Sequence, residues 1–195
     1  MKDYKVGEVA TIKLEDGTLM FGKLVSENKL ADIPVGETFG GFIVLEHFDN
    51  GTTAIIREDS VKGMEFGDNN DWRRSKVREY LNDEYLKELE QMFGTNNIIE
   101  HTVDLWSHDG FDDYGKSTDK VSLLTFDQYR KYHQDILKTN LSSWWWLLTP
   151  DSTPSGYGAG LVQYVGCDGF VGCDCCDFNG GVRPFCILKS DIFVS

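Results

Sequence analysis

The sequence predicts an α+β domain preceded by a β-hairpin. Short segments rich in β-branched and aromatic residues are separated by turn signals such as Asp-Gly and Asn-Gly, which is typical of hairpins. A few segments have apolar residues at helical spacing instead. With 195 residues, 41% of them hydrophobic and 13% aromatic, the chain is long and apolar enough to bury one substantial core.

Residues 1–29 are predicted to form a hairpin extension. Two β-rich runs, 9–14 and 19–25, flank a turn that contains Asp16-Gly17, and Asp-Gly between such runs favours a tight turn. We place the start of the main domain at residue 30. No repeat or low-complexity linker divides residues 30–195 further.

A second hairpin is expected at the start of the main domain. Strands over 42–47 and 52–57 flank the turn Asp49-Asn50-Gly51. Both strands are strongly apolar, which favours a position in a central sheet.

Three helices are expected from periodicity and capping signals. The first begins near Trp72 after an Asn-Asn-Asp capping signal, and the second follows Asn82 and is stopped by Gly94, since glycine is the usual residue after a helix end. The third extends from a Thr125 cap to Leu137.

Shorter strands and one exposed loop complete the prediction. Residues 107–120 are polar and interrupted by glycine, so they are expected to form an exposed loop. Strands are predicted over 98–103, 121–125, 144–148, 160–166, 170–173 and 182–188.

Charge and termini limit the function classes. A formal net charge of −13 argues against nucleic-acid binding, which depends on Lys and Arg. The N-terminus lacks the apolar segment of a signal peptide, and no run approaches the roughly 20 apolar residues of a membrane span. We therefore expect synthesis in the cytosol and no membrane insertion, and a phage particle or a signal-independent export route stays open.

The cysteines are unusually clustered. Of five cysteines, Cys167, Cys173, Cys175 and Cys176 lie close together in the chain. A disulfide scaffold is not expected without a secretory signal, so they bind metal or are free thiols. One C-x-x-C begins a zinc pattern, but adjacent cysteines on a strand face opposite sides. We predict no metal site, no cofactor and no catalytic residue.

An ordered set of motifs points to a family. Trp72-x-x-Ser-x-x-Arg78-x-x-Leu-Asn82, Val121-Ser-Leu-Leu, a Trp-Trp-Leu motif that includes Trp145, and Gly-Val-Arg183-Pro184 occur in this order. Together they resemble a bacterial and phage domain of unknown function, similar to the C-type-lectin-like fold shared with formylglycine-generating-type proteins. The resemblance covers about residues 30 to 190. It departs at Leu148-Thr149, where an Arg-Ser type pair is expected.

The resemblance implies twisted, mainly antiparallel sheets with two or three helices. It also implies framework roles, in hydrogen bonds or packing, for the motif residues Trp72, Arg78, Asn82, Trp145, Arg183 and Pro184.

The same fold is used by the hypervariable proteins of diversity-generating retroelements. There, scrambling of template adenines turns Asn codons into a restricted alphabet that includes Asn, Asp, Gly, Ser, Cys, Tyr, Phe, Val, Thr and Ala. Every residue from Tyr164 to Gly181 belongs to it, and residues 149–182 contain no Lys, Arg, Glu, Trp or Met. Ordinary turn chemistry explains the glycines and aspartates, but it does not explain the cysteines and aromatic residues.

We therefore predict a ligand-binding protein with a display region over residues 149–181, which recognises a protein or cell-surface ligand. Oligomers would add avidity. The rival classes are a thiol- or metal-dependent enzyme of formylglycine-generating type and a structural phage or cell-surface component. The expected contact residues are Tyr157, Tyr164, Cys167, Asp168, Phe170, Cys173, Asp174, Cys175, Asp177 and Phe178.

Overall fold

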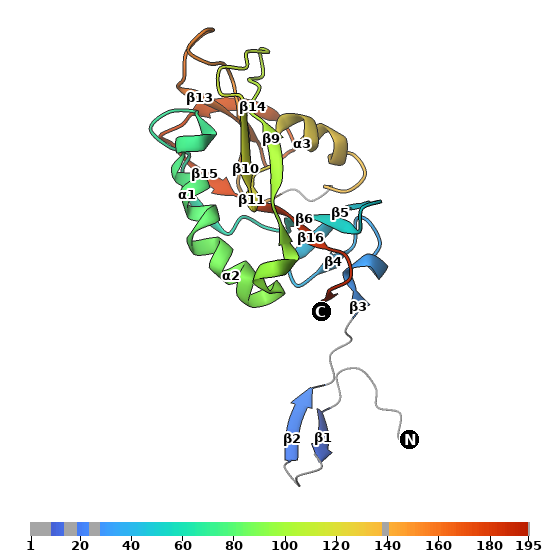
Figure 1. Ribbon diagram of the computed structural model, residues 1–195. Coiled ribbons are helices and arrows are strands. Elements are labelled where there is room, and N and C mark those ends of the chain that lie inside the picture. The colour runs from blue at the N-terminus through green and yellow to red at the C-terminus, as the bar shows by residue number, and fades with distance from the viewer. Residues whose placement is uncertain (1–8, 14–18, 24–27, 138–140, 195) are drawn as a thin grey trace.

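The computed structural model describes residues 9–13, 19–23, 28–137 and 141–194. The N-terminal strands are β1 (Val9–Lys13) and β2 (Leu19–Lys23), which pair in an antiparallel sheet of their own (Figure 1). The hairpin strands are therefore confirmed, and the predicted turn at 14–18 lies outside the described residues.

A six-stranded antiparallel sheet forms one half of the main domain. Its strand order is β11-β16-β6-β5-β4, and β8 also pairs with β16. The predicted second hairpin is confirmed as β5 and β6. The strands are β4 (Thr38–Phe39), β5 (Phe42–Phe48), β6 (Thr52–Arg57), β8 (Ile98–Ile99), β11 (Val121–Ser122) and β16 (Phe185–Lys189).

A five-stranded sheet forms the other half, in the order β14-β13-β12-β15-β7. Its one parallel pairing joins β12 to β15 through Trp145 and Gly181, and the other pairings are antiparallel. The strands are β7 (Lys62–Glu65), β12 (Trp145–Pro150), β13 (Leu161–Val165), β14 (Val171–Cys175) and β15 (Asn179–Val182).

The single strand predicted over 182–188 is wrong, because the chain changes sheets within it. β15 ends at Val182, and β16 begins at Phe185 in the other sheet. Pro184 has no N–H to donate to a ladder. Its carbonyl accepts a hydrogen bond from Arg57 N–H at 2.9 Å instead.

The helices are α1 (Lys76–Asn82), α2 (Glu84–Phe93) and α3 (Phe126–Tyr132). The first helix begins later than predicted, because Ser75 caps it and Trp72–Arg74 form a separate 3₁₀ turn. Gly94 ends α2 with φ of 83°, as expected. Thr125 caps α3 through a capping box, but the helix ends before Leu137. Two further 3₁₀ turns cover Leu30–Asp32 and Thr95–Asn97. Two short strands, β3 (Asn28–Lys29) and β17 (Phe193–Val194), pair with each other.

The exposed loop predicted over 107–120 is wrong in its second half. β10 (Lys116–Asp119) pairs with β9 (His101–Asp104). Tyr114 and Asp119 are buried, because their polar atoms find partners inside the fold. The strand predicted over 98–103 is likewise divided between β8 and β9, which belong to different sheets.

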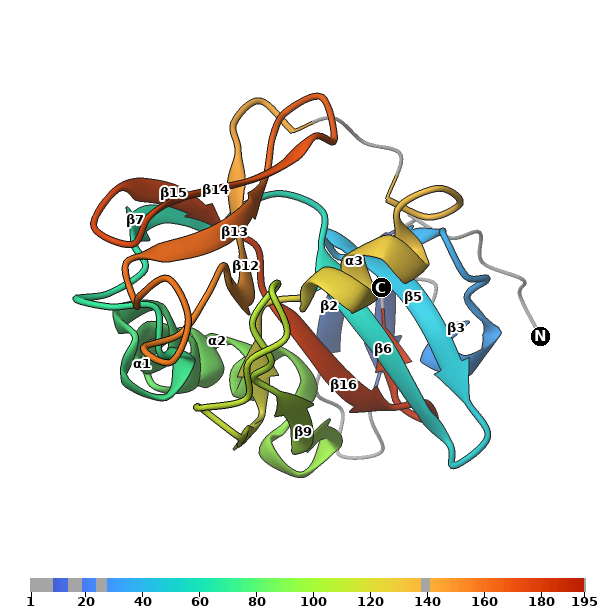
Figure 2. The same cartoon turned by 90° about the horizontal axis from the view of Figure 1, so that it is seen from above.

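The core consists of two apolar clusters on opposite faces of the sheets. Trp146 packs in the first cluster with residues of α1 and α2, and Trp145 packs in the second with Tyr129 and Tyr132 of α3. Figure 2 shows α3 lying over β5 and β6. The chain is thus a mixed α+β domain with mainly antiparallel sheets. None of the described helices has the length and apolar character needed to cross a membrane.

Candidate functional site

The predicted framework residues join the helices to the strands. Asp119 of β10 accepts hydrogen bonds from Trp72 Nε1 at 2.9 Å, Arg78 Nε at 2.7 Å and Ser117 Oγ at 2.6 Å. Asn82 exchanges hydrogen bonds with the main chain of Val121. The spacing of the first motif therefore brings its polar side chains to β10 and β11. Sequence reasoning missed Asp119, which lay in the predicted loop.

The other framework residues are also inside the fold. Trp145, Arg183 and Pro184 are buried. Trp144, the residue before the Trp-Trp-Leu motif, stacks edge-on against Trp146 with ring centroids 4.7 Å apart. Trp144 and Trp146 thus form an aromatic layer under the strands that carry the display region.

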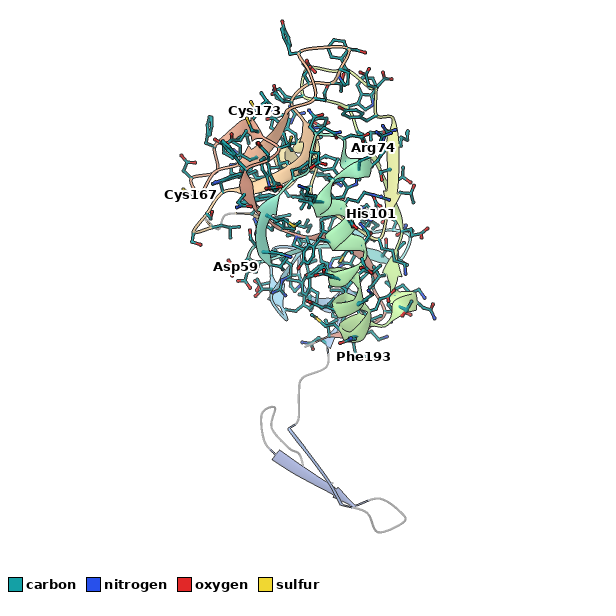
Figure 3. All side chains as sticks on the ribbon, turned by 90° about the vertical axis from the view of Figure 1, so that its left-hand side faces the viewer. Asp59, Arg74, His101, Cys167, Cys173 and Phe193 are labelled. Carbon is teal, nitrogen blue, oxygen red and sulfur yellow. The ribbon has the colours of Figure 1, made fainter. Side chains whose placement is uncertain are left out.

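Most of the predicted contact residues are exposed; only Tyr164 and Asp174 are half-buried. They lie mainly along the hairpin of β13 and β14 and the turn that follows it. In Figure 3, Cys167 and Cys173 lie on one flank of the molecule, and Arg74 and His101 lie toward the other. We call residues 161–179 the display strip.

The tip of the display strip is a tight turn. Gly166 N–H donates to Phe170 O at 2.7 Å, and Asp168 Oδ1 accepts from Phe170 N–H at 3.1 Å. Gly169 has φ of 82°, a conformation that favours glycine. The turn leaves Cys167, Asp168 and Phe170 exposed.

Tyr164 supports the strip from below. Its ring lies 5.1 Å from that of Trp144 between centroids. Gly172 lies directly across from Tyr164 in β14, and a side chain added there would meet the rings of Phe170 and Tyr164 at about 3 Å. Tyr164 is therefore half-buried packing as well as a candidate contact.

The C-x-x-C pattern does not converge on one point. Cys173 is exposed, whereas Cys176 is 5% exposed and belongs to the first core cluster. Cys176 N–H donates to Gly160 O at 3.0 Å, and its carbonyl accepts from Gly67 N–H at 3.1 Å. Across the described ranges, no group of three His, Cys, Asp or Glu side chains is placed to hold a metal ion.

The surroundings of Cys173 and Cys176 favour the protonated form of their thiols. Burial raises the pKa of the Cys173 thiol, and the nearby Asp151 carboxylate raises it further. Burial also raises the pKa of Cys176, and Asp177 adds to this. Because the thiolate is the nucleophilic form, these surroundings work against nucleophilic reactivity of the two thiols.

A second loop lies beside the display region; the sequence predicted an exposed loop here but not its contact with that region. Residues 105–115 contact residues 150–159: His108 N–H donates to Pro150 O at 2.8 Å, and Ser155 N–H donates to Asp113 Oδ2 at 2.9 Å. The two loops project together from one end of the molecule (Figure 1). Trp106 in this loop is 53% exposed. In the sequence, the signal that this loop has a role was an aromatic residue, Trp106, beside polar ones.

A groove separates this loop from α3. Its volume is about 640 Å³. His108 and Phe126, which both line it, meet edge-on with ring centroids 4.9 Å apart. The groove is lined mainly by residues outside the display region, among them Trp106, His108, Phe126 and Arg130, and Thr149 is the lining residue that belongs to that region.

Several positions within 149–181 are closed to a ligand. Thr153, Val162 and Gly181 are buried. A Cβ on Gly180 would lie 2.4 Å from Trp144 Cζ3 and 2.5 Å from Trp146 Nε1. The predicted display region therefore alternates between exposed positions and positions that belong to the frame.

The candidate site is thus a row of exposed aromatic, thiol and carboxylate side chains on a buried aromatic support. Its geometry suits contact with a surface rather than enclosure of a small molecule. Comparison of the chain with protein-family models, curated proteins and solved structures finds no match.

Proposed function

We propose that this chain is a ligand-binding protein whose display region recognises a protein or cell-surface ligand without making or breaking bonds. The observation that carries the proposal is the exposure of three large aromatic side chains: Tyr157 at 97%, Phe170 at 61% and Phe178 at 52%. At these positions the three rings bury little of their surface against the rest of the fold. Aromatic rings supply contact area at low entropy cost, and small polar neighbours supply adaptable hydrogen bonds.

We further propose that the domain has a C-type-lectin-like fold and is a variable protein of a diversity-generating retroelement. The restricted alphabet from Tyr164 to Gly181 supports this, as do the unpaired exposed thiols of Cys167, Cys173 and Cys175. The buried network around Asp119 is the kind of constant frame that a variable surface needs.

The nucleotide sequence tests the diversification proposal directly. We expect a nearby near-repeat of the coding segment, with differences confined to adenines in one copy. Differences should be found at exposed positions such as Cys173 and absent at Gly180, where any side chain collides with Trp144 and Trp146. A source genome without such a repeat contradicts the retroelement, although it leaves ligand binding untouched.

Binding itself is tested by removing the exposed rings. A variant combining Tyr157→Ser, Phe170→Ser and Phe178→Ser should melt like the wild type, yet lose enrichment against a surface-displayed ligand library by at least about tenfold. Phe193→Ser is the matched control, because Phe193 is 60% exposed but lies outside the display region. Equal enrichment of the triple variant and the wild type would reject the binding role, as expected for a structural phage or cell-surface component.

The rival enzyme class rests on Cys173 and Cys175, which are both exposed and project from the same face of β14. A thiol-dependent oxidase of formylglycine-generating type would consume oxygen with a Cys-containing peptide. Such uptake, lost in Cys173→Ser and Cys175→Ser, would favour this class over ligand recognition.

A further inference from the structure

The open edge of β14 has a defined hydrogen-bonding pattern. β14 is the last strand of its sheet. Gly166 N–H donates to Phe170 O at 2.7 Å, and Cys176 N–H donates to Gly160 O at 3.0 Å. Antiparallel pairs alternate between bonded and non-bonded. Gly172 and Asp174 therefore bond to β13, whereas Val171, Cys173 and Cys175 direct their main-chain groups toward the open side.

Two of these three residues keep their outward groups available. Cys175 N–H donates to Asp174 Oδ1 at 2.8 Å, and its carbonyl accepts from Phe178 N–H at 3.0 Å. Within the described part of the chain, the outward N–H and C=O of Val171 and Cys173 form no hydrogen bond to another residue. The edge also has no Pro, Lys or bulge, the devices that usually prevent strand addition.

The two faces of β14 differ in chemistry. Val171, Cys173 and Cys175 alternate with Gly172 and Asp174, so one face carries aliphatic and thiol groups. The other face carries the Asp174 carboxylate, and Phe170 lies over Gly172. A strand placed beside β14 would match it by alternating apolar and basic side chains.

The charge of the strip favours a basic partner. Asp168, Asp174 and Asp177 belong to a segment, 149–182, that contains no Lys or Arg. None of the salt bridges found among the described residues includes these three carboxylates. With a net charge of −13, a second copy of this chain would bring like charges together, whereas a cationic segment would neutralise them.

We propose that an extended, basic segment of a partner protein adds to the β14 edge as a further strand, bonded to the main chain of Val171 and Cys173. This inference rests on the proposed ligand-binding role and specifies its mode. Main-chain bonds supply affinity in such complexes, and alternate side chains supply specificity. Affinity for the edge would then survive many side-chain changes in the strip, because Val171 and Cys173 contribute through their backbone.

The first experiment uses the full chain and a synthetic heptapeptide of alternating Lys and Val. We expect amide hydrogen exchange at Val171 and Cys173 to slow about tenfold when most of the protein is bound, because both N–H groups become bonded. N-methylation of the peptide at alternate residues should abolish the effect in one register and spare it in the other. A peptide of alternating Glu and Val should not bind.

The second experiment changes the edge itself. Cys173→Pro removes an outward N–H and leaves the ladder to β13 intact, whereas Cys173→Val keeps the N–H and replaces only the thiol. Peptide binding should fall at least about tenfold in the first variant and stay near wild type in the second. Equal binding by the two variants would overturn the proposal, and if Cys173→Pro does not fold, the N-methylated peptides decide.

Two further outcomes would also overturn it. One is slowed exchange at Val171 and Cys173 that depends on protein concentration without peptide, which would indicate a second copy as the occupant. The other is a ligand selected from the displayed library that needs Tyr157, Phe170 and Phe178 but leaves exchange at this edge unchanged. In that last case the ligand-binding role stands and strand addition fails.

Discussion

The guanidinium carbon of Arg183 lies 5.0 Å from the ring centroid of Trp145. This contact joins the Gly-Val-Arg-Pro motif to the Trp-Trp-Leu motif inside the fold. Arg183 is 1% exposed, and it donates from Nε to Arg57 O at 2.8 Å and from Nη2 to Glu58 O at 3.0 Å. Burial lowers the pKa of its guanidinium to about 10, so the side chain stays charged at neutral pH.

Arg183→Ala should lower the free energy of unfolding by about 3 kcal/mol, because two carbonyls lose their donor and a cavity opens beside Trp145. Arg183→Lys should recover only part of this, since an ammonium cannot reproduce the planar fork. Chemical denaturation measures both, and Arg130→Ala on the surface is the control. Unchanged stability together with lost ligand binding would place Arg183 in recognition instead of the frame.

Asp119→Asn should destabilise the protein by about 2–4 kcal/mol, because it weakens a buried network and leaves Arg78 without its carboxylate. Asp104→Asn is the matched control: its carboxylate is 55% exposed, and we expect a change within about 0.5 kcal/mol. Urea denaturation at pH 7 compares the two. Similar losses in both variants would mean that the network around Asp119 contributes little.

The Asp119 carboxylate should also affect how the stability of the protein falls in acid. Burial tends to raise the pKa of Asp119, but hydrogen bonds from Arg78, Ser117 and Trp72 outweigh it, so the pKa in the folded state is lowered. Its stabilising contribution is therefore present above the unfolded-state value of about 3.9 and is lost as the pH falls below it. The stability of Asp119→Asn should fall less steeply than that of the wild type in this acid range.

His101 should make stability depend on pH nearer neutrality. Burial lowers the pKa of its imidazole, although Ile99 and Asp119 oppose this. The unfolded chain then binds the proton first, so stability is lost as the pH falls through about 6.5 and below. His101→Gln should flatten this part of the profile, and His108→Gln, at an exposed position, should not. Identical profiles for wild type and His101→Gln would refute the prediction.

Gly180→Ala should cost about 1–3 kcal/mol, because the added methyl group collides with the rings of Trp144 and Trp146. Gly160→Ala is the control from the same region, since its Cβ would meet no atom within 4 Å. Thermal unfolding of the two variants should separate a frame position from a free one. If the two melt alike, the alternation of frame and display positions within 149–181 is incorrect.

Local chemistry alone was enough for the elements with strong signals of their own. The β5–β6 hairpin follows from its apolar runs and Asp-Asn-Gly turn. Gly94 ends α2 because the chain there needs a φ of 83°, which glycine adopts without strain. The alternation of Trp145 and Trp146 between two cores is a property of any strand. The mixed α+β class and the exposure of Phe170 and Phe178 were likewise within reach of composition and pattern.

The long-range partners were decided only by the tertiary structure. Asp119 looks like a loop carboxylate in the sequence, and it becomes a buried acceptor because Trp72 of a 3₁₀ turn and Arg78 of α1 reach it from a distant part of the chain. In the sequence, Arg183-Pro184 lies within an otherwise apolar run. Only the structure shows that the guanidinium of Arg183 binds the carbonyls of Arg57 and Glu58. The open edge of β14 depends on strand order, which no local pattern encodes. Periodicity reports which way a side chain points, whereas only the assembled sheets determine what it meets.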